Sequence, residues 1–158
     1  MENISSHVSY KEATRSIVAK RKALDNIPNA EQLTKMKLLA EKVFEPLREY
    51  FNVPIYIHSM FRSSEVNEAI GGAKSSQHMK GEAMDIDGQI FGGITNKGIF
   101  DYIRFNLDYD QLIGESLTDD NDYEWIHVSY KEEGNRKQIL IMDDSTGAIV
   151  YKQFEEDK

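Results

Sequence analysis

The chain has 158 residues, a length that suits one domain able to bury a core without disulfides or other cross-links. It contains no cysteine, so any zinc site must be built from histidine and carboxylate ligands. The formal net charge of −8 argues against a nucleic-acid partner, because binding to phosphates needs a basic surface.

No segment approaches the roughly 20 apolar residues of a membrane-spanning helix, which argues against membrane insertion. The N-terminal segment carries charges throughout and lacks the apolar stretch of a secretory signal. We therefore expect a monomer that is cytoplasmic at synthesis and reaches any external target only after release.

The first third of the chain is predicted to be helical. Residues 9–23 form a modestly amphipathic segment. A second helix is predicted to begin after Asn29, where Gln32 completes a loose capping-box pattern. Apolar residues recur at steps of three and four from there to Phe51, and Pro46 is predicted to kink or interrupt the helix.

From residue 53 onward, predicted strands alternate with shorter helices. Two helices are predicted, one that ends near Ile70 and one that runs from about Thr95 to Leu107. The last three β-rich runs are separated by turn sequences, which predicts an antiparallel meander. Predicted helices in the first part of the sequence and predicted hairpins in the last part indicate a single α+β domain. We expect a helical part at 1–52 and a mainly antiparallel core at 53–154. The predicted strands are 53–61, 83–87, 111–114, 125–130, 138–142 and 148–154.

The segment 75–87 contains two candidate metal ligands, His78 and Asp85. Their separation of seven would place them on opposite faces of one straight strand. They converge only if the chain turns between them, and Gly81 permits such a turn. Ala83 is small and shares a face with Asp85, which leaves room beside a metal ion.

His127 is the third candidate ligand. Alternation along the predicted strand 125–130 directs Ile126 and Val128 to the core and leaves His127 on the other face. Two neutral imidazoles and one carboxylate make a three-ligand zinc site with the fourth position open to water. The remaining charge of about +1 would lower the pKa of that water toward roughly 7.

These residues resemble the zinc D-Ala-D-Ala carboxypeptidase and dipeptidase family, whose fold is related to the hedgehog domain. The pattern S-x-H-x-x-G-x-A-x-D runs from Ser76 to Asp85 and is followed by Glu124-Trp125-Ile126-His127. Upstream, the segment 59–63 reads S-M-F-R-S and is similar to the S-G-Y-R-S motif of a phage-associated branch. The resemblance covers about residues 55–141.

The resemblance implies that His78, Asp85 and His127 bind Zn²⁺, that Glu124 is the general base or acid, and that Arg62 binds the substrate carbonyl or the oxyanion. The implied activity is hydrolysis of peptidoglycan stem peptides by a phage or prophage wall-lysis enzyme. The alternatives are a zinc-retaining binding or virion structural module, and a cytoplasmic dipeptidase. Glu124 and His127 are an odd number apart, so we predict a break or bulge in the strand at Glu124.

Other polar residues have structural interpretations. His58 shares a strand face with Arg62 and could border the cleft, but a packing role is expected; Asp87 is either an acceptor behind the metal ligands or a solvated loop residue. Gln111 and Glu115 are expected to support the site from a neighbouring strand without a catalytic role. The acidic segment 119–122 lacks the pattern of an EF-hand and is predicted to be a flexible loop.

Overall fold

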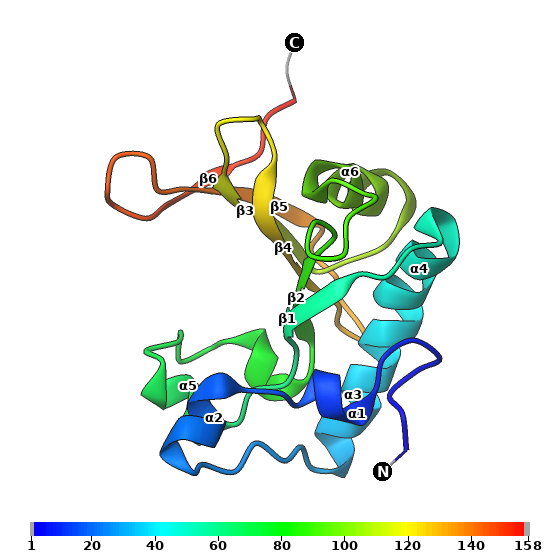
Figure 1. Ribbon diagram of the computed structural model, residues 1–158, viewed down its shortest axis with the longest axis vertical. Coiled ribbons are helices and arrows are strands. Elements are labelled where there is room, and N and C mark those ends of the chain that lie inside the picture. The colour runs from blue at the N-terminus through cyan, green and yellow to red at the C-terminus, as the bar shows by residue number, and fades with distance from the viewer. Residues whose placement is uncertain (1, 157–158) are drawn as a thin grey trace.

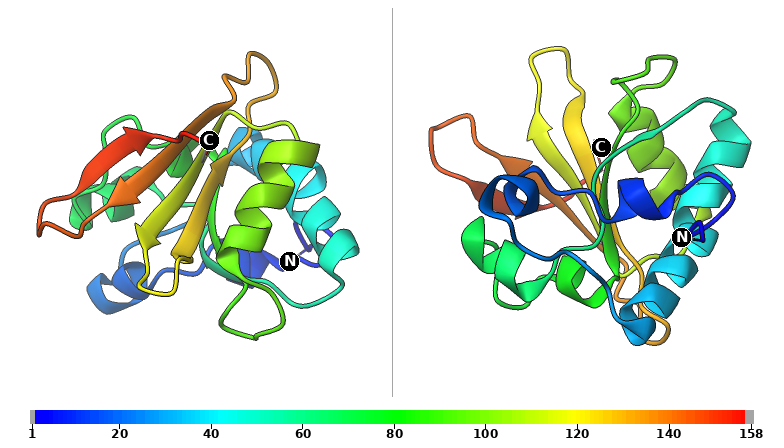
Figure 2. Two further views of the ribbon diagram at one scale, coloured as in Figure 1. Left: turned by 90° about the horizontal axis from the view of Figure 1, so that it is seen from above. Right: turned by 60° about the horizontal axis from the view of Figure 1, so that its bottom comes forward.

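The computed structural model describes residues 2–156 and contains a six-stranded mixed sheet with helices around it (Figure 1). The α+β prediction is confirmed. Figure 2 shows α3, α4 and α6 on one side of the sheet, whereas α2 and α5 lie on the other side. The helices are α1 (Tyr10–Ala13), α2 (Ile17–Lys22), α3 (Ala30–Leu39), the π-helical η1 (Ala40–Phe44), α4 (Glu45–Phe51), α5 (Ser64–Ala69), the 3-10 helix η2 (Gln77–Lys80) and α6 (Asn96–Asn106).

The sheet has the order β1-β2-β4-β3-β5-β6, and only β3 and β5 are parallel to each other. Within residues 2–156, no helix has the length and apolar character needed to cross a membrane. The strands are β1 (Tyr56–Ser59), β2 (Ala83–Asp87), β3 (Gln111–Leu117), β4 (Tyr123–Ser129), β5 (Gln138–Asp143) and β6 (Val150–Gln153).

The N-terminal helices differ from the prediction in one respect. The single helix expected over 9–23 is wrong, because Thr14 ends α1 and the Ser16 hydroxyl accepts a hydrogen bond from the backbone N–H of Ala19 at 3.1 Å. A serine with this bond is a helix N-cap, so a second helix begins there.

The long helix begins as predicted and passes Pro46 without a break. The side chains of Asn29 and Gln32 each accept the other's backbone N–H at 2.8 Å, which confirms the capping box. The chain then stays helical to Phe51 through the π-helical η1, which ends two residues before Pro46. Because proline has no backbone N–H, the altered bonding of a π segment accommodates it without ending the helix.

The predicted antiparallel meander is wrong, although its last two strands do form a hairpin. β4 lies between β2 and β3, and β5 pairs in parallel with the opposite edge of β3. Asp110, buried just before β3, explains this path. Its carboxylate accepts hydrogen bonds from the Arg136 guanidinium at 2.9 and 3.1 Å, and its carbonyl accepts the backbone N–H of Gln138 at 3.0 Å. These bonds hold the start of β5 beside β3.

The two faces of the sheet have different side chains. Met84 and Ile86 of β2, and Ile126 and Val128 of β4, are fully buried in the core beneath the helices. Alternation therefore directs the residues between them to the opposite face. Asp85 is paired directly with His127 across the β2–β4 ladder, so this face is where the candidate site forms.

The turn at Gly81 joins η2 to β2 and is confirmed. Gly81 has φ of +76°, and a Cβ atom there would lie 2.5 Å from the backbone oxygen of Gln32. Both the left-handed conformation and the close approach of α3 require glycine. This turn sets the distance between His78 and Asp85.

Gly81→Ala is expected to destabilise the protein more than Gly134→Ala. Gly134 has nearly the same φ, +75°, but a Cβ atom added there would have no other atom within 4 Å. The control should lose about 1–2 kcal/mol from the left-handed conformation alone, and Gly81→Ala should lose roughly 1–3 kcal/mol more from the clash. Urea unfolding measures both losses, and equal losses would contradict this account of the turn.

Candidate active site

The structure brings the three predicted metal ligands together on the open face of the sheet. His78 comes from η2, Asp85 from β2 and His127 from β4. Nε2 of His78 lies 3.3 Å from Oδ2 of Asp85, and Nδ1 of His127 lies 2.9 Å from Oδ1. One donor atom from each residue lies within 4.8 Å of the other two. The three side chains can therefore bind one ion.

The orientation of the His78 ring is fixed by a backbone contact. Its Nδ1 lies 2.8 Å from the carbonyl oxygen of Met60, and a carbonyl only accepts hydrogen bonds, so Nδ1 carries the proton. In the neutral form of the ring, the form that binds a metal ion, the lone pair is then on Nε2, the atom nearest Asp85. The backbone N–H of Arg62 donates to the carbonyl of His78 at 3.1 Å. The segment 60–62 thus holds His78 through both its ring and its backbone.

The electrostatics of Asp85 suit a cation. Burial by itself raises the pKa of this carboxyl, but the charge of His78 and the hydrogen bond from His127 outweigh burial and hold its pKa well below the usual range. Asp85 is therefore ionised at neutral pH. Two imidazoles and one carboxylate, with no cysteine in the chain, are a donor set that fits zinc.

Arg62 lies beside the ligands and is held in place by its neighbours. Its Nη1 donates to Oδ1 of Asn67 at 2.9 Å, and the Asn67 amide donates in turn to the carbonyl of Ala73 at 2.9 Å. A Cβ atom at Gly72 would lie 2.1 Å from the same Asn67 oxygen, so this contact requires glycine. Burial lowers the pKa of Arg62 and the charge of Asp85 acts in the opposite direction. An arginine remains charged in either case.

A groove of about 1150 Å³ runs along this face of the sheet. It is lined by the three candidate ligands and Arg62, and it continues over β5 and β6, where Met142 and Tyr151 contribute to its wall. Partial burial raises the pKa of the Tyr151 phenol, and the negative charges of Glu115 and Asp85 raise it further. The β5–β6 hairpin therefore faces the same acidic groups as the metal site.

Glu115 is a groove residue whose burial was not predicted. It lies on β3 between Trp125 of β4 and Met142 of β5, and it is only 6% exposed. Its Oε2 is buried without a hydrogen-bond partner among the described residues. Burial raises its pKa to about 7, while His127 lowers it and Asp85 raises it. The sequence predicted Glu115 beside the site on a neighbouring strand, but that predicted strand ended at residue 114, and the pairing with β5 that buries the side chain was not predicted.

The break predicted at Glu124 is wrong. β4 is continuous from Tyr123 to Ser129, and its pairing with β3 keeps one register on both sides, with Glu115 opposite Trp125 and Leu117 opposite Tyr123. The Asn96 amide donates to the carbonyls of Tyr123 and Glu124 at 2.9 and 3.1 Å, which holds this part of the strand extended.

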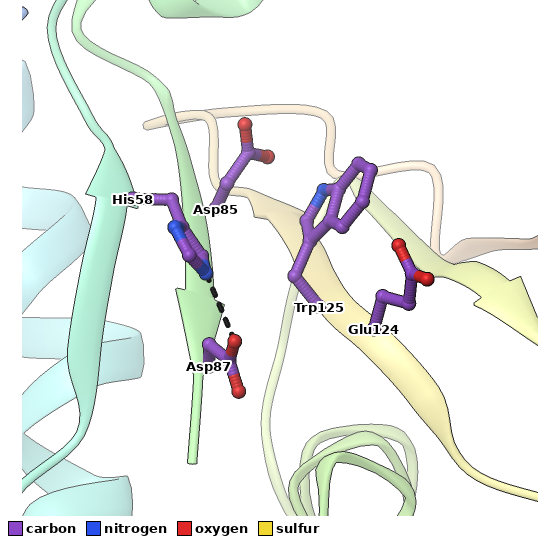
Figure 3. A pocket seen from close by; sticks show the side chains of 5 residues that line it. All are labelled: His58, Asp85, Asp87, Glu124 and Trp125. Atoms are coloured by element: carbon purple, nitrogen blue, oxygen red, sulfur yellow. Dashed lines mark hydrogen bonds and ion pairs between the residues drawn. The ribbon is translucent and has the colours of Figure 1, made fainter. Parts of the chain in front are cut away.

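Glu124 lines a second, smaller pocket and not the groove. This pocket, of about 510 Å³, is formed with His58 and Asp87, and it shares only Asp85 and Trp125 with the groove. Glu124 itself is exposed. In Figure 3 the Trp125 indole lies between the carboxylates of Asp85 and Glu124. Asp85, one of the three candidate ligands, thus borders both the groove and the pocket that Glu124 lines.

His58 and Asp87 form a hydrogen-bonded pair beside this pocket, with Nε2 and Oδ2 2.9 Å apart (Figure 3). Asp87 is buried and also accepts the Asn96 amide at 3.0 Å and the Gln89 N–H at 2.9 Å. The solvated-loop interpretation of Asp87 is therefore wrong. Asp122 is buried too and accepts the Lys97 N–H at 2.6 Å, so the segment 119–122 is anchored to α6 at its end.

Comparison with known proteins agrees with this site. A family model described as Peptidase M15 matches residues 6–106, well over half of the chain. The chain therefore belongs to the peptidase M15 family, whose members are zinc-dependent peptidases, and the predicted family resemblance is confirmed. The match contains Arg62, His78 and Asp85, whereas His127 joins the site through the sheet. No curated protein matches the chain.

Zinc binding should depend on the three ligands and not on the neighbouring histidine. His78→Ala and His127→Ala are each expected to weaken zinc affinity by more than the roughly 10–100-fold that loss of an outer partner causes. His58→Ala removes an imidazole that is hydrogen-bonded to Asp87, which is not a ligand, and should leave the affinity within a few-fold of the wild type. Competition with a chromophoric chelator measures all three. A large effect of His58→Ala would place the ion elsewhere.

In the zinc-free protein, Glu115→Gln is expected to become more stable than the wild type as pH rises. The pKa of Glu115 is about 7 in the fold against an ordinary value of 4.5, so between these values the folded state binds more protons than the unfolded state. Wild-type stability therefore falls with rising pH in this range. The advantage of Glu115→Gln should grow from about pH 4.5 to 7 and then level off.

Urea unfolding at several pH values measures this difference. Glu124→Gln is the control variant, because it removes one negative charge from an exposed position. Subtracting its effect on stability corrects Glu115→Gln for the change in net charge. If the advantage of Glu115→Gln did not vary with pH after this correction, the raised pKa would be refuted.

Proposed function

We propose that this protein hydrolyses peptide bonds in peptidoglycan stem peptides, with zinc held by His78, Asp85 and His127. The observation that carries the proposal is the convergence of these three donors in one groove with a fixed guanidinium and a buried carboxyl group. Membership of the peptidase M15 family supports the same reaction class. We further propose that the protein acts as a monomer.

Each element of the site has a part in hydrolysis. Zinc bound by these residues would polarise a water molecule and lower its pKa toward about 7. Arg62 keeps its charge and lies on the groove surface, so it can bind the substrate carbonyl and stabilise the negative charge that develops on its oxygen. The water oxygen joins the carbonyl carbon, the C–N bond breaks, and a carboxyl group moves one proton from the water to the leaving nitrogen.

The size of the groove favours a peptide chain over a free dipeptide as substrate. Sites for small molecules enclose about 300–1,000 Å³, and this groove is somewhat larger and extends from η2 to the β5–β6 hairpin. A stem peptide would extend along it on either side of the metal. The similarity of the segment 59–63 to a phage-associated motif supports a role in phage or prophage wall lysis.

Digestion of purified peptidoglycan with the zinc-loaded protein, followed by mass analysis of the fragments, tests the proposal. Release of D-Ala, dipeptides or new amino groups is expected, and the fragment masses identify the bond that is cut. Bound zinc without any cleavage would instead support the alternative of a binding or virion structural module.

Arg62→Lys is expected to lower kcat/KM on the cleaved peptide by about 10²–10³-fold, because an ammonium group cannot keep the planar contacts of a guanidinium. Zinc affinity should not change, because Arg62 is not a ligand. Arg48→Lys in α4, on the opposite side of the sheet, is the matched control and should leave the rate unchanged. An equal loss in both variants would show a general effect and not a role of Arg62 in the reaction.

A further inference from the structure

We propose that Asn96, the first residue of α6, is a positioning residue that holds Glu124 beside the strand of the metal ligand Asp85. The family resemblance implies that Glu124 carries the proton from the attacking water to the leaving nitrogen. The inference rests on that role and on the proposed peptidase function. Asn96 itself lies outside the motifs that contain the candidate site residues.

The backbone of Glu124 is the part of β4 that the sheet does not hold. Within residues 2–156, every other residue of β4 is paired with a residue of β2 or β3. The β2–β4 pairs end at Ile86 and Ile126, and β3 pairs with the residues on either side of Glu124 but not with Glu124 itself. Opposite this gap, Ser116 of β3 has φ of +55°, a conformation that is uncommon for residues other than glycine and recurs at functional sites. β4 stays continuous, but Glu124 needs another support.

The side chain of Asn96 supplies that support. Its amide nitrogen donates to the carbonyls of Tyr123 and Glu124 at 2.9 and 3.1 Å, and to Oδ1 of Asp87 at 3.0 Å. Its amide oxygen accepts the backbone N–H of Gly88 at 2.8 Å. Asp87 and Gly88 directly follow the last residue of β2 that pairs with β4. One fully buried side chain therefore joins the two strands just beyond the end of their ladder.

This pattern of bonds is specific to an amide group. Two carbonyls and a carboxylate surround the nitrogen of Asn96, and a backbone N–H faces its oxygen. An ionised carboxyl group of the same shape has no hydrogen to donate, and a hydroxyl group has only one. Asn96→Asp therefore removes the support of Glu124 while it keeps the size of the side chain.

Asn96 is itself held firmly at the start of α6. The backbone N–H groups of Asn96 and Lys97 donate to the carboxylate of Asp122 at 3.3 and 2.6 Å. The Thr95 hydroxyl caps the helix by accepting the N–H of Gly98 at 3.0 Å. Because Asp122 directly precedes β4, the starts of the helix and of the strand are joined both through Asp122 and through the Asn96 side chain.

The position of the Glu124 carboxyl group depends on this backbone support. Glu124 is exposed, so packing does not fix its side chain, and it lines the same pocket as the metal ligand Asp85 (Figure 3). A proton carrier must be within hydrogen-bond reach of the reacting atoms, directly or through one water. A displacement of about 1 Å can cost roughly 10²-fold in rate. Asn96 thus affects the reaction through Glu124, without contact with substrate or metal.

The test uses zinc-loaded variants and the peptidoglycan peptide, under conditions in which urea unfolding shows each variant to be folded. We expect Asn96→Asp to lower kcat by about 10²-fold, with KM and zinc affinity within a few-fold of the wild type. Asn96→Ala removes the same donors without adding a charge and should show the same loss, should the aspartate variant not fold. Leu47→Ala, at a fully buried position of α4, controls for lost stability and should keep the wild-type kcat.

A double-mutant cycle separates positioning from a purely structural role. Glu124→Gln alone is expected to lower kcat by about 10²–10⁴-fold. If Asn96 acts through Glu124, adding Asn96→Asp to this variant should lower the single-turnover rate by no more than a few-fold further. A residue with only a structural role would lower the rate equally in both backgrounds.

The possible failures are distinguishable. An equal loss in both backgrounds, or a wild-type kcat in Asn96→Asp, would overturn this inference and leave the proposed function standing. Loss of zinc from Asn96→Asp would also overturn it, because the residue would then act on the metal. A fully active Glu124→Gln would overturn it too, by removing the group through which Asn96 acts. A zinc-loaded wild type that cuts no peptide bond would overturn the proposed function itself and this inference with it.

Discussion

The antiparallel pairing of β2 with β4 is the constraint on which the site depends. It sets Asp85 directly opposite His127, and the residues on either side of each, Met84 and Ile86 with Ile126 and Val128, are fully buried. A slip of one residue in β4 would turn its two apolar side chains, Ile126 and Val128, to the open face and His127 into the core. At about 25 cal/mol per Å² of buried apolar surface, the core enforces the register strongly. The alignment of these two ligands therefore follows from the packing of the opposite face.

The remaining components of the site are attached to this ladder by backbone hydrogen bonds. His78 lies outside the ladder, and the carbonyl of Met60 and the N–H of Arg62 fix its ring and its backbone. The same short segment carries the Arg62 side chain into the groove, where Asn67 holds it. A shift of the segment would therefore move a ligand and the guanidinium together. This coupling joins the segment 60–62 to His78, sixteen or more residues away in the sequence, in one site.

The parts of the structure that sequence could predict are those set by local chemistry. The capping box at Asn29, the turn at Gly81 and the face of His127 each depend on a few adjacent residues, and each was predicted from the sequence. The partner of β5 could not be predicted, because it depends on an ion pair between Asp110 and Arg136, 26 residues apart. Glu115 was predicted beside the site, but its burial was not predicted, for the same reason, since β5 lies against it.

The buried acids of the fold differ in their hydrogen bonding. In a chain with a net charge of −8, each buried carboxylate adds to an unfavourable electrostatic balance unless a donor neutralises it. Asp87, Asp110 and Asp122 meet this requirement through hydrogen bonds that join strands to helices or to each other. The Oε2 atom of Glu115 has no such donor among residues 2–156. An unsatisfied buried carboxyl group costs stability, and this one lines the same groove as Arg62 and the metal ligands.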